Sequence, residues 1–104
     1  MAYDFNRAYM DIDSLMAYKA VDREVGQSFG VVVLAVELSN REYQHRFDKL
    51  RDTHTMKKPP SSNRIFAGYL VVRNVGQKDQ YETWMPEHVF IELYEKISLQ
   101  KADR

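Results

Sequence analysis

The sequence FGVVVLAV at residues 29–36 decides the fold class of this chain. It is short, rich in β-branched side chains and apolar at both sets of alternate positions, which is typical of a strand covered on both faces. Valine is only a modest helix former, so a helix over the same residues is less favoured. We therefore expect a central strand here.

A helix follows this strand. SNRE at residues 39–42 has the capping-box pattern, in which the side chains of Ser39 and Glu42 each accept a hydrogen bond from the other's backbone amide. Three apolar residues then recur at intervals of four and three along one helical stripe: Tyr43, Phe47 and Leu50. The spacing predicts a helix of about three turns.

Residues 51–64 form the most irregular part of the sequence. They show no hydrophobic periodicity and contain PPSSN at residues 59–63, which predicts a loop. We place a basic, proline-containing loop at residues 52–66. It is longer than a routine connector, so we expect it to be either functional or mobile.

A hairpin is predicted next. GYLVVR at residues 68–73 and QYETW at residues 80–84 read as two strands, joined by a turn that contains Gly76. In the second strand, the alternation places Glu82 and Trp84 on one face. Pro86 then stands at a first helical position, and apolar residues repeat at one, three and four, so we expect a helix over residues 86–99.

The N-terminal part is aromatic and then weakly periodic. Residues 2–11 include three aromatic side chains that must dock on their own domain or on a partner subunit: Tyr3, Phe5 and Tyr9. Asp11 or Asp13 can cap a helix that runs to Glu24, and Gly26 provides its stop. The apolar stripe of this helix is narrow.

These elements predict one α+β domain over residues 1–104, with a small antiparallel sheet of about three strands packed with two to three helices. Residues 1–27 are the N-terminal aromatic and helical segment, and residues 28–99 are the α+β core. A domain of this size gains stability by burying a sheet face or edge, so a homo-oligomer is one expectation.

Composition excludes several functional classes. The chain has 15 basic and 15 acidic residues, and this zero net charge disfavours a nucleic-acid coat protein. It has no cysteine, which excludes disulfides, thiol catalysis and Cys-ligated metals. The longest apolar run, at residues 31–36, is too short for a membrane span, and the N-terminus lacks a signal pattern. We expect a soluble intracellular protein without a membrane partner.

Positive charge is concentrated in the middle of the chain. Residues 40–64 contain seven basic and three acidic residues, whereas residues 1–39 carry a net charge of −3 and residues 65–104 a net charge of −1. The candidate partner-binding residues are Arg46, Lys49, Arg51, Lys57, Lys58 and Arg64. They predict a site for an anionic partner. The structural alternative is a solvated helix face with a soluble loop.

Catalytic and metal-binding patterns are absent from the sequence. No nucleophile elbow, phosphate-binding glycine loop or paired carboxylates in an apolar setting occur, so we expect no catalytic residue and no cofactor. Three histidines lack metal-ligand spacing: His45, His54 and His88. We therefore expect neither an enzyme nor a metal site.

Aromatic side chains offer a second candidate site. Four residues of the hairpin are candidates for a ligand pocket or an interface: Tyr69, Arg73, Tyr81 and Trp84. Aromatic residues anchor interfaces and stack on bases. The structural alternative is that Trp84 and Phe90 belong to the core.

Three segments resemble a group of small tailed-bacteriophage proteins: residues 35–43 (AVELSNREY), 68–72 (GYLVV) and 82–90 (ETWMPEHVF). Those proteins have an M-T-R-x-E-Y helix start, then G-Y-L-V, then S-W-x-P-K-x-V-F. Here Thr83 and Glu87 stand at the usual Ser and Lys positions. A fainter likeness is to phage proteins that sequester nucleotide immune signals, although their A-R-x-G-W-N-G segment is replaced here by VDREVG at residues 21–26.

The resemblance implies a phage-encoded accessory protein that acts by binding in the host cytoplasm. Its partner would be a host protein with an acidic surface or an anionic small molecule, and the host process would be anti-phage defence. Nucleic acid is a less favoured partner. Two alternatives stay open, a sponge for a nucleotide signal and a structural virion or adaptor protein.

Overall fold

The computed structural model describes residues 15–61 and 64–97. Its elements are β1 (Met16–Ala20), α1 (Arg23–Phe29), β2 (Val32–Glu37), α2 (Asn40–Leu50), β3 (Gly68–Arg73), β4 (Tyr81–Pro86), α3 (Glu87–Leu93) and β5 (Tyr94–Lys96). In this described part the chain forms one five-stranded antiparallel sheet with three helices, an α+β arrangement. The expectation of about three strands is therefore wrong.

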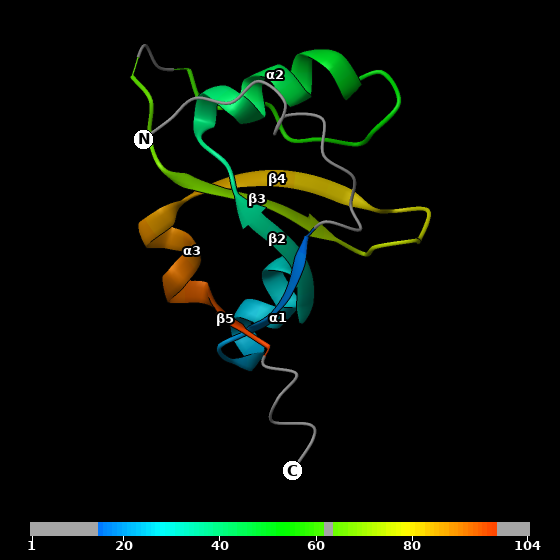
Figure 1. Cartoon of the computed structure of the whole chain (residues 1–104). Coiled ribbons are helices and arrows are strands. Elements are labelled where there is room, and N and C mark those ends of the chain that lie inside the picture. Colours follow the sequence, from blue (N-terminus) through cyan, green and yellow to red (C-terminus); the bar gives the residue numbers. More distant parts are fainter. Residues whose placement is uncertain (1–14, 62–63, 98–104) are drawn as a thin grey trace.

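β2 is the middle strand of the sheet, whose order is β4-β3-β2-β1-β5 (Figure 1). Val33 and Ala35 pack into the core on one face of the sheet, and Leu34 and Val36 pack against the core on the other. This confirms the prediction of a central strand covered on both faces. It also explains why this strand is apolar at every position between Val33 and Val36.

Two hydrophobic cores lie on opposite faces of the sheet. The helix α2 covers one face, where Tyr43 packs against side chains of β3 and β4 (Figure 1). The helices α1 and α3 lie on the other face, where Phe90 and Val25 pack against side chains of β1 and β2. The sheet is therefore the middle layer of the domain, and α2 stands apart from the other helices.

The predicted helix from Asp11 or Asp13 to Glu24 is wrong. Residues up to 14 lie outside the described chain, and the rest of that range contains β1 and the start of α1. β1 forms because it pairs with β2 on one side and β5 on the other, with Tyr18 facing the core. Tertiary pairing overrides a narrow helical stripe.

The cap and the stop of α1 also differ from the expectation. Asp22 is the N-cap and its Oδ1 accepts a hydrogen bond from the amide of Val25 at 2.9 Å. Gly26 lies inside α1, and the helix ends at Gly30 with φ of 111°. Only glycine adopts that conformation without strain, so Gly30 is the actual stop.

The C-terminal helix is shorter than predicted. α3 ends at Leu93, and Tyr94 turns to an extended conformation with φ of −134° to begin β5. Tyr94 is buried in the α3-side core, and β5 pairs with β1. The helical prediction is confirmed for residues 87–93 and is wrong for residues 94–96, where pairing with β1 competes with helix continuation.

The capping box and the hairpin are confirmed. Ser39 and Glu42 form reciprocal hydrogen bonds of 3.1 and 2.9 Å at the start of α2. β3 and β4 pair as an antiparallel hairpin, and a Cβ at Gly68 would overlap the indole of Trp84. The aromatic residues at positions 3, 5 and 9 lie outside the described residues.

Candidate functional site

An ion cluster is buried between α2 and β4. Arg46 of α2 donates from Nε to Glu82 Oε1 at 2.7 Å, and its Nη2 lies 3.4 Å from Glu82 Oε2. Arg46 and Glu82 are almost completely buried, with 1% and 0% exposure. A buried charge needs such a partner, because an uncompensated charge in the core costs several kcal/mol. Arg46 is therefore a structural residue under α2 and is not exposed to a partner.

His54 completes this cluster from the loop that follows α2. Its Nδ1 lies 2.6 Å from Glu82 Oε2, and its side chain is 32% exposed. An ionised carboxylate only accepts hydrogen bonds, so Nδ1 is the donor in this contact. His54 thus lies at the boundary between the buried ion cluster (Arg46, His54 and Glu82) and solvent.

Backbone hydrogen bonds fix the same loop to the edge of β4. The amide of Glu82 donates to the carbonyl of Thr55 at 3.0 Å, and the amide of Lys57 donates to the carbonyl of Glu82 at 2.8 Å. The hydroxyl of Tyr43 donates to the carbonyl of Lys57. Burial raises the pKa of the Tyr43 phenol, and the nearby Glu82 carboxylate raises it further. Tyr43 is therefore a neutral donor at physiological pH.

Asn40 fixes the distal end of the loop. Its Nδ2 donates to the carbonyl of Arg64 at 3.0 Å, and its Oδ1 accepts from the amide of Phe66 at 2.7 Å. Asn40 is itself buried at the first turn of α2. The loop is thus anchored to β4 near His54 and to α2 near Arg64.

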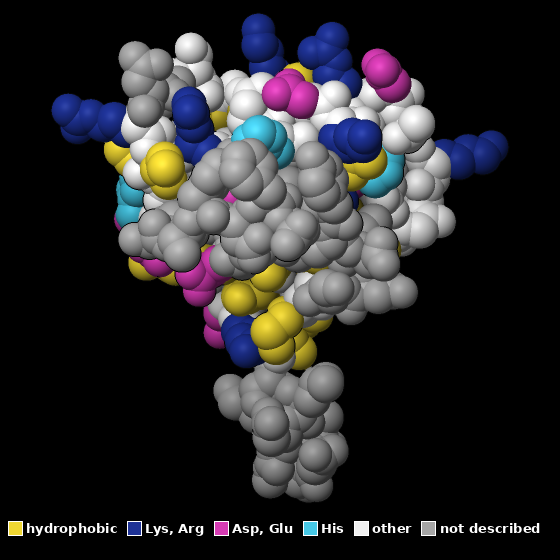
Figure 2. Space-filling view, turned by 45° about the horizontal axis from the view of Figure 1, so that its top comes forward, with side chains coloured by type: hydrophobic (Ala, Val, Ile, Leu, Met, Phe, Trp, Pro, Cys, Tyr) yellow, Lys and Arg dark blue, Asp and Glu magenta, His cyan; other side chains and the backbone are white. Residues whose placement is uncertain are grey.

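Exposed cations surround this anchored layer. α2 and its loop carry six exposed basic side chains, here called the cationic rim: Arg41, Lys49, Arg51, Lys57, Lys58 and Arg64. Only two carboxylates on these segments are exposed, Asp48 and Asp52. Figure 2 shows the Lys and Arg side chains spread around the α2 end of the molecule, pointing outward in several directions.

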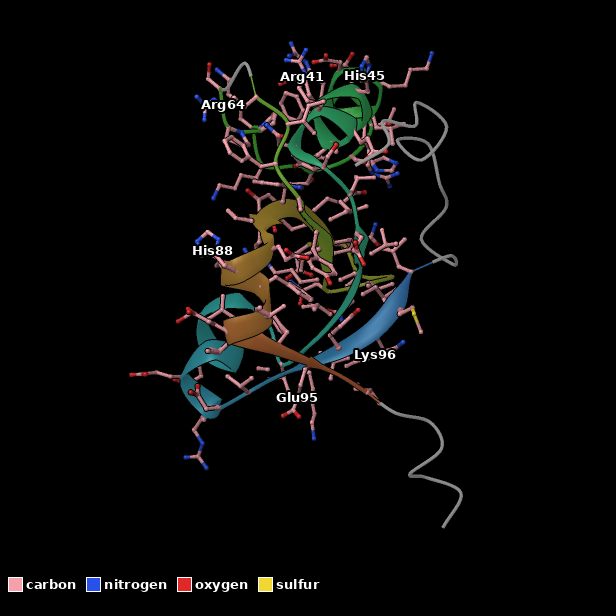
Figure 3. All side chains as sticks on the ribbon, turned by 60° about the vertical axis from the view of Figure 1, so that its left-hand side comes forward. Arg41, His45, Arg64, His88, Glu95 and Lys96 are labelled. Atoms are coloured by element: carbon pink, nitrogen blue, oxygen red, sulfur yellow. The ribbon has the colours of Figure 1, made fainter. Side chains whose placement is uncertain are left out.

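The remainder of the described surface has the opposite balance. Its exposed acidic residues are Asp22, Glu24, Glu37, Asp79, Glu87, Glu92 and Glu95. Its exposed basic residues are Lys19, Arg23, Lys78 and Lys96. Figure 3 shows Arg41 and Arg64 at the α2 end, whereas Glu95 and Lys96 lie at the other end of the domain. The formal net charge of the chain is zero, but its exposed charges are separated: basic residues predominate on α2 and its loop, and acidic residues predominate on the rest of the described surface.

The four hairpin candidates do not form one site. Trp84 is buried under α2 and donates from Nε1 to the carbonyl of Leu38 at 2.6 Å. Tyr69 lies on the opposite face, where its ring stacks on Phe90 with centroids 4.2 Å apart. Arg73 and Tyr81 are brought together, with the guanidinium 4.9 Å from the ring centroid.

The sequence did not predict that Glu82 and His54 are partners, nor that Arg41 belongs to the cationic rim. The burial of Arg46 could have been predicted from the helical period of α2. Arg46 follows Tyr43 by three residues, so both side chains lie on the inner face of the helix. Arg41 stands outside that stripe and is exposed. No local pattern pairs His54 with Glu82, which are 28 residues apart.

Comparison with known protein families, with curated proteins and with solved structures finds no match. Within residues 15–61 and 64–97, no group of three or more His, Asp or Glu side chains is arranged to hold a metal ion. In the same part of the chain, no helix has the length and apolar character needed to cross a membrane.

Proposed function

We propose that this protein is a non-catalytic binding protein that docks an acidic protein surface on its cationic rim. The observation that supports the proposal is the charge separation: six exposed cations and only two exposed carboxylates lie on α2 and its loop. Complementary charge steers association and selects partners, and it contributes more to the association rate than to the final affinity.

The anchoring of the loop supports the same function. Lys57 and the preceding residues are bonded to Glu82, and the backbone at Arg64 is bonded to Asn40. A loop held at both anchors loses less conformational entropy when a partner binds than a free loop of the same charge. The buried ion cluster therefore supports binding indirectly, by holding the segment that carries Lys57 and Lys58.

The likeness to small tailed-phage proteins supports a setting for this activity. We place the protein in the cytoplasm of an infected bacterium, where its partner is a host protein with an acidic surface. Interference with anti-phage defence is the host process that the resemblance favours. A virion component is the competing class, and mass spectrometry of purified particles would detect it.

The proposal is tested by partner capture from bacterial lysate with two charge-reversal variants of the tagged protein. The rim variant carries Lys57→Glu, Lys58→Glu and Arg64→Glu. The control variant carries Arg23→Glu, Lys78→Glu and Lys96→Glu, three exposed cations outside the rim. Both variants lower the net charge equally and replace two lysines and one arginine. They differ in the surface that carries the substitutions.

We expect the wild type and the control variant to capture the same protein, and the rim variant to capture at least about tenfold less, a difference of about 1.4 kcal/mol. Nuclease treatment of the lysate should leave capture unchanged. Equal loss of partner capture in both variants would show that capture depends on net charge alone. Loss of capture after nuclease treatment would identify nucleic acid as the partner. Either result would overturn the proposal.

A further inference from the structure

A polar surface pocket lies at the turn end of the hairpin, beside the loop that follows α2. Its volume is about 380 Å³. It is open to solvent and is bordered by the end of α1, the turn between β3 and β4, and the loop at Thr55. The lining residues are Gln27, Ser28, Gly30, Thr55, Arg73, Asn74, Asp79 and Tyr81. Such a volume lies at the small end of the range for ligand pockets, about 300–1,000 Å³.

Arg73 is the principal cation of this cavity. Its guanidinium lies against the ring of Tyr81, at 4.9 Å from the centroid, and its Nη1 lies 3.4 Å from the carbonyl of Ser28. A guanidinium has five N–H donors in a planar fork that matches phosphate and carboxylate. Within the described chain, its other donors have no hydrogen-bond partner. The tyrosine ring therefore orients a cation whose donors remain available to a ligand.

The absence of a side chain at Gly30 lets the backbone at the end of α1 lie close to Arg73. Gly30 has φ of 111°, and a Cβ there would lie 3.4 Å from the Cβ of Arg73 and 3.3 Å from Val33. Asn74 has φ of 55° and is the one non-glycine residue of the described chain with positive φ. Gly30 ends α1 and Asn74 begins the turn after β3, and both residues line the pocket.

Asp79 supplies an acceptor at the same cavity. Its Oδ2 accepts from Asn74 Nδ2 at 3.0 Å, which fixes the carboxylate and leaves Oδ1 without a hydrogen-bond partner in the described residues. A fixed carboxylate accepts hydrogen bonds from hydroxyl groups, and the neighbouring Arg73 prefers an anion. The site thus pairs a phosphate-type donor set with a hydroxyl-type acceptor.

We propose that the Arg73 cavity binds a small phosphorylated sugar, the moiety that a mononucleotide also presents. The phosphate group bonds to the guanidinium of Arg73, and sugar hydroxyls bond to Asp79. This site shares no residue with the cationic rim, so it is a second binding activity and does not depend on the proposed partner capture.

Isothermal titration calorimetry with four defined compounds tests this site: ribose 5-phosphate, adenosine 5′-monophosphate, adenosine and inorganic phosphate. We expect saturable binding of the first two, and binding at least about tenfold weaker for adenosine and phosphate, each of which lacks one of the two groups. Binding of the mononucleotide alone would extend the ligand to the base and overturn the sugar-phosphate assignment. No saturable heat from any compound up to about 1 mM would remove the site altogether.

A matched pair of variants localises the binding. Arg73→Gln should weaken ribose 5-phosphate binding by at least about tenfold. The control is Arg51→Gln, because Arg51 also lies over an aromatic ring, that of Phe47 at 5.6 Å, but belongs to the cationic rim. Arg51→Gln should leave sugar-phosphate binding unchanged.

Asp79→Asn keeps the proposal testable if Arg73→Gln does not fold. Asp79 is exposed, and the amide of Asn retains the shape of the carboxylate but not its charge. We expect a several-fold loss of ribose 5-phosphate affinity with an unchanged melting temperature. Unchanged affinity in folded Arg73→Gln or Asp79→Asn protein would overturn the proposal.

Discussion

The two faces of the sheet are stabilised by different chemistry. Under α2, the ion cluster of Arg46, His54 and Glu82 holds a loop whose lysines face solvent. Under α3, an aromatic cluster surrounds Phe90, with ring centroids of Tyr69, Tyr18 and Tyr94 at 4.2, 4.9 and 5.4 Å. The ion cluster fixes particular groups in particular geometry, whereas the aromatic cluster stabilises the fold through apolar burial.

This difference separates stability from binding. A defect in the aromatic cluster should lower the free energy of unfolding and leave the cationic rim intact in the molecules that remain folded. A defect in the ion cluster should lower stability and also release the loop that carries Lys57 and Lys58.

Glu82→Ala should lower the free energy of unfolding by about 3–5 kcal/mol, because it removes the buried carboxylate with which the buried guanidinium of Arg46 is paired. Chemical denaturation measures this loss. The double variant Arg46→Met with Glu82→Leu should be more stable than Glu82→Ala alone, since it removes both charges. A loss below about 1 kcal/mol for Glu82→Ala would show that the ion cluster does not stabilise the domain.

Phe90→Leu should lower the free energy of unfolding by about 1–2 kcal/mol, the order expected for partial loss of a buried side chain. Partner capture per folded molecule should match that of the wild type. A variant that unfolds at wild-type denaturant concentration, or that folds but loses capture, would contradict the separation of the two faces.

Ser39→Ala should cost about 1 kcal/mol, because it removes the N-cap of α2 and leaves the amide of Glu42 without its acceptor. Thermal unfolding detects the change. Ser39→Asp is the matched control, since aspartate also caps helices and should restore most of the loss. Equal destabilisation by alanine and aspartate would show that packing at this position matters more than the cap.

High pH should act through Tyr43. Burial raises its pKa in the folded state, so the unfolded chain loses the phenolic proton first. The stabilisation that the protonated Tyr43 phenol provides is fully present below pH 10, the ordinary pKa of tyrosine. Above that pH the free energy of unfolding falls as pH rises, by up to about 1.4 kcal/mol per pH unit. Tyr43→Phe should have lower stability at neutral pH and a shallower alkaline slope. Identical slopes would exclude Tyr43 as the group responsible.

Local sequence patterns predicted the elements whose causes are local. The capping box at Ser39 and Glu42, and the alternation that places Glu82 beside Trp84, both depend on neighbouring residues, and both are present. β1 and β5 were missed because each is short and forms by tertiary pairing, β1 with β2 and β5, and β5 with β1. Their side chains carry little periodicity, so only the tertiary partner distinguishes strand from helix.

The candidate site was predicted in its composition but not in its arrangement. Five of the six cations proposed from sequence are exposed on α2 and its loop, and Arg46 is buried. The helical period of α2 predicts the burial of Arg46, because Arg46 lies on the same face of the helix as Tyr43. The contact between His54 and Glu82 spans 28 residues and follows from the fold alone.

Retention of the purified protein on immobilised poly-L-glutamate, as the NaCl concentration rises from about 50 to about 300 mM, tests most directly whether the cationic rim binds acidic polymers. The wild type and the control variant should be retained at low salt and elute together as salt screens the contact, while the rim variant should pass without retention. Equal retention of the rim and control variants would contradict the claim that an acidic partner binds at the cationic rim.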